Sequence, residues 1–265
     1  MSMVATETEL KWAVAIKQAA EADAEIDASP MSDFEFVQHA IVAKDKVPSA
    51  LLRIKKLQRF KSRYGIVRDG SYEEACSDIR RFMEFFDNGF HLSLASTEKH
   101  VNVVYADYSK FDAKRLKAEE GFNIVLRGFF YLMQAAQPNF VAIREGFTFL
   151  ADCQDFGWRN FSRQLEERAA QLYSHTYPVH IMHMVFLRAP AVFRFIYNLI
   201  RFVLSRKTRK TLAMTLEREI WLENSSYPPS VLPKAWGGLV DEGCAEQAML
   251  QKLKERYDNA AKFRL

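Results

Sequence analysis

The stretch IMHMVFLRAPAVFRFIYNLIRFVLSRKTRK, residues 181–210, combines a strand pattern, a very apolar helix and a basic cluster. The run 181–187 is apolar enough for a buried strand, and Ala189-Pro190 can open a helix over residues 191–204. That helix carries ten large apolar residues and one narrow polar stripe of Arg194, Asn198, Arg201 and Ser205. A surface helix needs only one apolar face. This helix is therefore either a core element or a cover that lies over an apolar cavity and meets a bilayer when it opens.

The basic residues of the chain are concentrated near this helix. The whole chain has 37 basic and 33 acidic residues, a formal charge of +4. Residues 168–216 contain eight basic residues and no Asp or Glu, which leaves 29 basic against 33 acidic residues elsewhere. The densest part is Arg206, Lys207, Arg209 and Lys210. This cluster is either a solvated surface or a membrane contact. The apolar helix 191–204 beside it favours contact with an anionic membrane, where each basic residue contributes about 1 kcal/mol to binding.

Outward from this stretch, strands and helices alternate. Strands are expected at residues 90–94, 101–105, 146–151, 181–187 and 212–216, and helices at residues 113–136, 160–176 and 191–204. This alternation predicts an α/β fold with a largely parallel sheet built from βαβ units. Further helices are expected at residues 7–28, 33–44, 48–65, 71–86 and 243–257. Asp87-Asn88-Gly89 is a turn signal and the expected domain boundary.

The composition is that of a soluble globular chain. With 265 residues, 49% hydrophobic and 26% charged, it excludes disordered, collagen-like and disulfide-stapled classes. Cys76, Cys153 and Cys244 form no CxxC pair, which favours free thiols in a reducing compartment. The sequence has no secretory signal and no run of about eighteen apolar residues that could span a membrane. We therefore expect a cytoplasmic protein, and its 21 Phe residues suit a wide apolar interior.

The known catalytic motifs are missing from the sequence, which has no GxSxG elbow, phosphate loop, dinucleotide glycine fingerprint or HExxH. Asp152 and Asp155 could form an acid pair, but Asp at the end of a strand is more typical of a turn. His175, His180 and His183 suggest a metal site, yet positions 180 and 183 of a strand point to opposite faces. We expect structural or headgroup-facing histidines, and no enzyme activity, metal or cofactor.

Several short motifs occur in a specific order along the chain. They are residues 146–152 followed by Gly157, Tyr177-Pro178, Ala189-Pro190 followed by Phe193, Phe202, and Leu232-Pro233 with Gly237-Gly238. Together they resemble the CRAL-TRIO lipid-binding domain of phosphatidylinositol and tocopherol transfer proteins. The resemblance implies an N-terminal helical domain at 1–87, a lipid-binding domain at 88–242 and a C-terminal helix at 243–265. It further implies a mixed, mostly parallel sheet as the floor of a lipid pocket, with the helix 191–204 as its gate.

By residue matching, the resemblance assigns roles to individual side chains. The pocket is expected to be lined by Phe147, Phe149, Ala151, Met182, Met184 and Phe186. The gate is expected to use Val192, Phe193, Phe195, Ile196, Leu199, Ile200, Phe202 and Val203. Headgroup or membrane phosphates are expected at His180, Arg206, Lys207, Arg209 and Lys210. Arg206 and Lys210 match phosphoinositide-contacting residues of the tocopherol-type members, and Lys210 also matches a Lys of the phosphatidylinositol-type members.

Three departures from the family pattern bear on the cargo. Val179-His180 stands where phosphatidylinositol-type members carry Glu-Arg, which removes a charge pair used for the inositol headgroup. Phe147 and Phe149 replace small hydroxyl residues that help to seat choline, and Arg188 replaces the usual Asn. Together these changes favour a more apolar cargo or a differently recognised headgroup.

The expected function is that of a non-enzymatic carrier that holds one lipid and transfers it between membranes. A phospholipid, a tocopherol-like lipid, a sterol or a carotenoid could be the cargo, and an anionic membrane is the expected partner. One alternative is a lipid-sensing adaptor that presents its lipid to another protein without net transfer. A second is an enzyme for a small apolar substrate. Nucleic acid is not an expected partner, because the basic cluster lacks the aromatic platform that single strands require.

Overall fold

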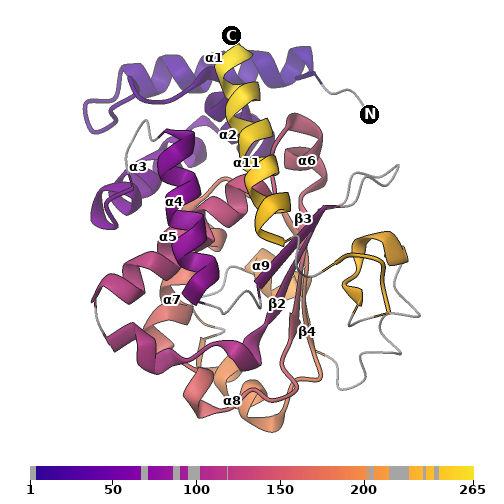
Figure 1. The fold of residues 1–265 in the computed structure, drawn as a ribbon. Helices are drawn as coiled ribbons and strands as arrows, with labels where there is room; N and C mark the ends of the chain where they lie inside the picture. The colour runs from indigo at the N-terminus through magenta and orange to yellow at the C-terminus, as the bar shows by residue number, and fades with distance from the viewer. Residues whose placement is uncertain are drawn as a thin grey trace.

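The computed structural model describes residues 4–66, 71–85, 90–94, 102–117, 119–200, 202, 206–214, 227–234, 237–241 and 245–265. Four helices precede the sheet: α1 (Glu7–Glu21), α2 (Asp33–Ala43), α3 (Val47–Arg63) and α4 (Tyr72–Phe85). Within the described residues, six further helices follow: α5 (Glu119–Ala135), α6 (Phe140–Glu145), α7 (Arg163–Gln171), α8 (Ala191–Ile200), α9 (Arg206–Thr211) and α11 (Ala245–Lys262). Figure 1 shows α1 to α3 gathered at one end of the molecule, with α11 reaching back to them.

The first helices begin where side chains satisfy their free N–H groups. Thr6 with Glu9, and Ser32 with Glu35, form capping boxes at the starts of α1 and α2. Helix α1 ends at Glu21, earlier than the predicted 28, because the chain turns there and Ile26 becomes buried in the core between α1, α2 and α3. Helix α3 carries Pro48 in its first turn, as predicted, where a missing N–H costs nothing.

The sheet has five strands in the order β1-β2-β3-β4-β5. They are β1 (Phe90–Leu94), β2 (Asn102–Asp107), β3 (Phe147–Asp152), β4 (Ile181–Leu187) and β5 (Leu212–Met214). Strands β1 and β2 pair antiparallel, and the remaining neighbours pair parallel. The predicted α/β class with a mixed, mostly parallel sheet is therefore confirmed.

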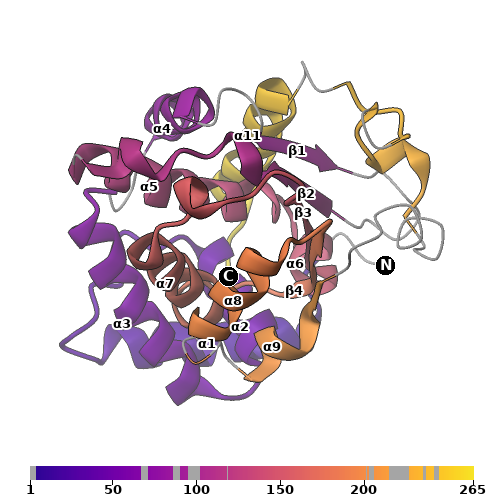
Figure 2. The same ribbon diagram turned by 90° about the horizontal axis from the view of Figure 1, so that it is seen from below.

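Alternate side chains of the strands enter two separate cores. Val103, Leu150 and Val185 point to the face that is covered by Val231 and Leu232. Their neighbours in sequence point to the opposite face, toward α5, α7 and α8; these include Val104, Phe149, Ala151, Met184 and Phe186. Figure 2 shows the segment around Pro229–Val231 on the far side of the sheet from α5 and α7.

Two further predicted helices also differ from the structure in extent. The predicted helix 113–136 is divided into a 3-10 helix, Ala113–Lys117, and α5. The predicted gate helix 191–204 ends as α8 at Ile200, and Phe202 lies in a turn. Val203 and the predicted boundary at 87–89 lie outside the described residues, so the division into domains stays a prediction.

A buried polar network joins the N-terminal helices to the C-terminal helix. Gln38 of α2 donates through Nε2 to the Pro178 carbonyl at 2.9 Å and to Gln137 Oε1 at 3.1 Å. Arg256 of α11 donates to Gln38 Oε1 at 2.6 Å and to the Gln137 carbonyl at 2.9 Å. Because buried polar groups are costly unless paired, this network fixes α2, α11 and the Tyr177-Pro178 segment to one another. Among the described residues, no helix is both long and apolar enough to cross a membrane.

Candidate functional site

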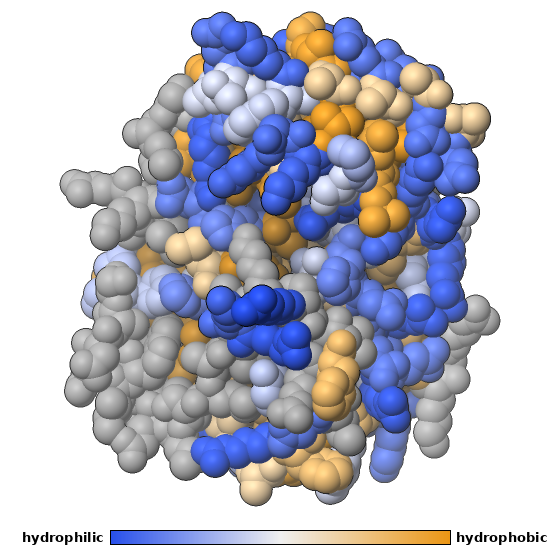
Figure 3. Space-filling model, turned by 180° about the vertical axis from the view of Figure 1, so that it is seen from behind, coloured by the Kyte–Doolittle hydropathy of each residue, from blue (hydrophilic) through white to orange (hydrophobic). Residues whose placement is uncertain are grey.

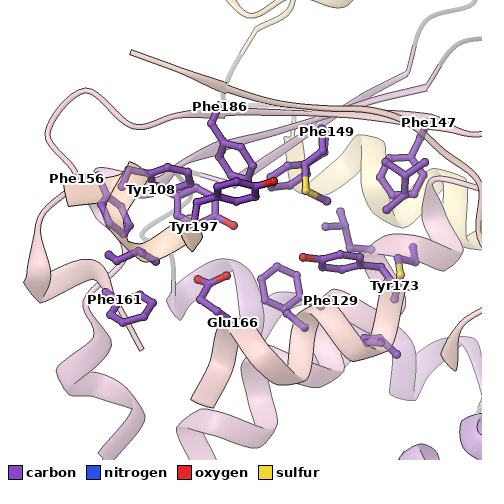
Figure 4. Close-up of a pocket in the computed structure, with 18 residues that line it drawn as sticks. Tyr108, Phe129, Phe147, Phe149, Phe156, Phe161, Glu166, Tyr173, Phe186 and Tyr197 are labelled. Atoms are coloured by element: carbon purple, nitrogen blue, oxygen red, sulfur yellow. The ribbon is translucent and has the colours of Figure 1, made fainter. Parts of the chain in front are cut away.

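An apolar cavity lies between one face of the sheet and the helices packed against it (Figure 4). The space between its lining side chains, counted together with the mouth that is open to solvent, amounts to about 890 Å³. The sheet side is formed by five buried side chains: Phe147 and Phe149 of β3, and Ile181, Met184 and Phe186 of β4. Four of these are among the six pocket residues expected from the sequence, and Ala151 lies buried in the same core.

Three helices close the cavity from the opposite side. Helix α5 contributes Phe129, Leu132 and Met133, and α8 contributes Phe193, Ile196 and Tyr197. Helix α7 and the π-helix that continues it, Leu172–Thr176, contribute Glu166, Ala169, Leu172 and Tyr173. Tyr108, Phe156 and Phe161 complete the wall from the connecting segments. The wall is therefore mainly aromatic and aliphatic, which is the chemistry of a site for a hydrocarbon chain.

The expectation for Met182 is corrected by the structure. Phe147 pairs with Ile181 and the next residue, Thr148, pairs with His183, so Met182 is the extra residue of a bulge in β4. The bulge turns Met182 outward, where 39% of it is exposed, and puts Ile181 into the cavity wall. Strict alternation of side chains between the two faces of β4 would put Met182 on the same face as Met184, on the cavity wall. It fails here because the bulge places two residues of β4, Ile181 and Met182, along one residue of β3.

A glycine allows the two central strands to approach at their amino ends. Gly146, with φ of 76°, precedes β3, and a Cβ there would lie 2.2 Å from the His180 carbonyl oxygen. His180 is half-buried, and its Nδ1 is 3.1 Å from the Arg144 carbonyl oxygen. Leu212 pairs with Met184, so α9, which leads into β5, lies at the same end of the sheet as His180. The predicted headgroup residues thus gather at the amino ends of β4 and β5.

Helix α8 presents one side to the cavity and the other to solvent. Phe193 is buried and its ring lies 4.5 Å from that of Phe186 and 5.2 Å from that of Phe156, between centroids. Val192 is half-buried and Ile196 is buried. Phe195, in contrast, is 54% exposed, and its ring meets that of Trp158 edge to face with 5.9 Å between centroids; Trp158 is 61% exposed. Leu199 and Ile200 lie in the last turn of α8.

An apolar and basic surface accompanies this helix. Phe202 is 75% exposed, and Arg194, Arg206, Arg209 and Lys210 are exposed. Lys207 lies in α9 with the other basic residues of the cluster. Figure 3 shows this face of the molecule, with strongly hydrophilic side chains over α9 near the centre and apolar ones along the edge where α8 lies. Exposed aromatic residues beside basic ones are typical of surfaces that meet membranes. Trp158 was not among the residues predicted from the sequence.

One carboxyl group faces the otherwise apolar cavity. Glu166 of α7 lies on the same helix face as Ala169 and Tyr173, and Figure 4 shows its carboxylate pointing into the cavity. Burial raises the pKa of Glu166 from 4.5 to about 7. Burial also raises the pKa of Tyr173 and of Tyr108, and the charge of Glu166 adds to both shifts. The helical spacing of Glu166 with Ala169 and Tyr173 is the sequence signal that could have found it.

The acidic and histidine residues considered in the sequence are placed apart from this cavity. Asp152 accepts a hydrogen bond from the Gln154 backbone at 3.0 Å and pairs with Arg188, while Asp155 is exposed. His175 and His183 are exposed as well. Within the described part of the chain, no three His, Cys, Asp or Glu side chains are placed to hold a metal ion.

Comparison with known proteins gives the family of this chain. A family model for the CRAL/TRIO domain matches residues 87–238, more than half of the chain. Tyrosine-protein phosphatase non-receptor type 9 from Mus musculus and from Homo sapiens is 27% identical over 118 residues, which is 44% of this chain. The match spans only 19% of those relatives' own length.

A solved structure has a similar fold. The crystal structure of Sfh5 has a TM-score of 0.54 to this chain at 13% sequence identity, covering 98% of this chain and 100% of that one. The apolar cavity between sheet and helices, the ordered motifs and the family match agree with one another. This chain therefore belongs to the CRAL/TRIO family of lipid-binding domains.

Proposed function

We propose that this protein holds one lipid in the cavity behind α8 and carries it between membranes without chemical change. The observation that supports this most directly is the enclosed aromatic and aliphatic wall, to which β3, β4, α5, α7 and α8 all contribute. Each CH₂ left in water costs about 0.8 kcal/mol, so a chain of about sixteen carbons costs on the order of 12 kcal/mol. A closed cavity removes that cost during transit.

Helix α8 acts as the gate in this proposal. Its inner side holds the cavity closed through Phe193, Ile196 and Tyr197, whereas Phe195 on its outer side already faces solvent beside Trp158. When the protein lies on a bilayer, hydrocarbon can replace the inner contacts of α8, so that opening exposes little apolar surface to water. The lipid then exchanges with the membrane.

The basic residues of α9 hold the protein on an anionic membrane. Arg206, Arg209 and Lys210 are exposed, and in the described part of the chain no ion pair joins them to an acidic residue. His180 lies at the same end of the sheet and is a candidate contact for a lipid headgroup at the cavity mouth.

The membrane contact is tested by binding to vesicles of phosphatidylcholine with about one fifth phosphatidylserine at low salt. Replacing Arg206, Arg209 and Lys210 with Ala should weaken sedimentation with these vesicles by tenfold or more, because each charge contributes about 1 kcal/mol. The matched control replaces Lys44 and Lys46 at the connection between α2 and α3, and Lys56 on α3; all three are exposed, and this variant should bind like the wild type. Equal loss in both triple variants, or no loss in the first, contradicts this assignment.

A lipid-sensing adaptor is the second candidate function. The curated relatives support it, because the matching region makes up only 19% of their length, so there it is one part of a longer protein. Transfer of a fluorescent lipid from donor to acceptor vesicles separates the two functions. A carrier accelerates the transfer in proportion to its concentration, whereas an adaptor binds the lipid and leaves the transfer rate unchanged.

A further inference from the structure

Glu166 is the one acidic residue among the described residues that line the cavity. Apart from tyrosine hydroxyl groups, the described part of the wall is otherwise aromatic and aliphatic, and no Lys, Arg or His is present in it. Among the described residues, no hydrogen bond or ion pair joins the Glu166 side chain to another group. Glu166 is half-buried, and a carboxyl group in an apolar wall loses part of its hydration unless another polar group replaces it, so a polar group of a bound lipid can serve as its partner.

Tyrosine hydroxyl groups border the same space. Tyr173 lies in the π-helix that continues α7, seven residues after Glu166, and lines the same cavity. Figure 4 shows the Glu166 carboxylate and the Tyr173 hydroxyl group pointing into one gap, with the rings of Tyr108 and Tyr197 across from them. A polar group of a bound lipid would meet a donor and acceptors there, while its hydrocarbon lies against the phenylalanines of the sheet.

The side chains around Glu166 and Tyr173 restrict which polar group of a lipid can bind between them. A phosphate would meet a carboxyl group and no cation on the described wall, so phospholipid headgroups do not fit. A cationic amine would have to leave water, and burying two opposite charges gains little after desolvation. A hydroxyl group carries no charge and can both donate to and accept from Glu166.

We propose that Glu166 determines specificity for a lipid whose polar group is a single uncharged hydroxyl, held inside the cavity between Glu166 and Tyr173. This inference rests on the proposed function, since it names the class of lipid that the cavity selects. The raised pKa of Glu166 is consistent with it, because a neutral carboxyl group at pH below about 7 offers both a donor and an acceptor.

The test compares lipids that differ only in this group. The full-length protein is incubated at pH 6 with phosphatidylcholine vesicles that contain equal amounts of cholesterol and 5-cholestene, or of 1-octadecanol, octadecane and octadecylamine. Protein-bound lipid is then extracted and quantified by gas chromatography and mass spectrometry. The wild type should favour the hydroxyl lipid over its hydrocarbon by about tenfold in at least one set, which corresponds to about 1.4 kcal/mol, because only the hydroxyl lipid can form a hydrogen bond in the cavity.

Two variants assign the preference to Glu166. In Glu166→Leu the ratio of hydroxyl lipid to hydrocarbon should fall to near one, whereas Glu166→Gln, whose amide also donates and accepts, should keep most of it. A wild-type ratio near one, a preference for octadecylamine, or a bound lipid that is only phosphatidylcholine overturns the inference while leaving the carrier function standing. Recovery of no lipid at all from the folded wild-type protein contradicts the proposed function instead.

Discussion

Arg188 pairs with Asp152 across the carboxyl ends of two neighbouring strands, β4 and β3. The Arg188 guanidinium donates through Nε to Asp152 Oδ1 at 3.1 Å, and a second contact joins its Nη2 to Oδ2. Arg188 adopts φ of 52°, a left-handed conformation in which Asn is tolerated better than other residues with a side chain. This explains why Asn suits the position in related domains, and shows what Arg adds: an ion pair with a buried carboxylate that offsets the backbone strain.

The first prediction concerns this pair. Arg188→Ala should lower the free energy of unfolding by about 1–3 kcal/mol, because it leaves Asp152 buried and without its cation. Arg188→Asn should cost about 1 kcal/mol less than Arg188→Ala, because Asn adopts the left-handed conformation more readily. Urea denaturation at pH 7 measures both. Equal losses for the two variants would show that the backbone at Arg188 is not strained.

The second prediction concerns the bulge in β4. Ile181→Ala should lower the free energy of unfolding by about 2–4 kcal/mol and reduce lipid uptake, because Ile181 is 8% exposed and forms part of the cavity wall. Met182→Ala, one residue away and 39% exposed, is the control and should change stability by less than about 1 kcal/mol. The reverse order of effects would place Met182, and not Ile181, on the wall.

The third prediction separates the two sides of α8. Phe193→Ala should destabilise the protein by about 3–4 kcal/mol, because the ring of Phe193 packs against Phe186 and Phe156. Phe195→Ala should leave stability within about 0.5 kcal/mol and weaken vesicle binding, because Phe195 lies on the exposed side beside Trp158. Thermal unfolding and vesicle sedimentation are measured on both variants. Loss of stability without loss of membrane binding in Phe195→Ala speaks against a membrane contact there.

The fourth prediction concerns pH. Glu166 titrates near 4.5 in the unfolded chain and at about 7 in the folded one. Between these values only the folded state holds the proton, so the free energy of unfolding falls as pH rises, by up to about 3 kcal/mol. His39 acts in the opposite direction, because burial lowers its pKa from 6.5 to about 3. Between these values only the unfolded chain binds the proton, so the free energy of unfolding falls as pH falls below 6.5.

The Glu166→Gln variant separates the contribution of Glu166 to the pH dependence of stability from that of His39. It should gain stability relative to the wild type as pH rises from 4.5 to 7, because it keeps the His39 titration and loses that of Glu166. Urea denaturation at several pH values gives the difference between the two proteins. A difference that does not change across this interval would mean that Glu166 is solvated in the folded state.

Much of the fold could be predicted from local patterns. The bounds of β4 agree with the apolar run at 181–187, and the Ser32 and Pro48 signals place the starts of α2 and α3. These signals are local because capping and burial depend on a few neighbouring residues. Helix α6 was not predicted: it has six residues, begins at the Asn139 cap directly after Pro138, and is too short to show helical periodicity.

The parts of the site that could not be predicted depend on the pairing of distant segments. The Met182 bulge arises from the register between β3 and β4, which no pattern within β4 reveals. Trp158 gains its place beside Phe195 because the 3-10 helix Trp158–Asn160 lies against α8. Asn160, expected to start a helix, instead donates to the Ser109 carbonyl at 2.9 Å and accepts from the Gly157 backbone, so α7 begins later, after the Ser162 cap.

Native mass spectrometry of the 265-residue protein after incubation with mixed-lipid vesicles shows directly whether the cavity holds a lipid. We expect one lipid per chain in the wild type. We expect none in Ala169→Phe, whose added ring would fill the cavity from α7 while circular dichroism shows the helices retained. Wild-type protein that stays folded yet appears only at the mass of the bare polypeptide, or equal lipid loading in Ala169→Phe, would contradict the claim that this cavity carries the lipid.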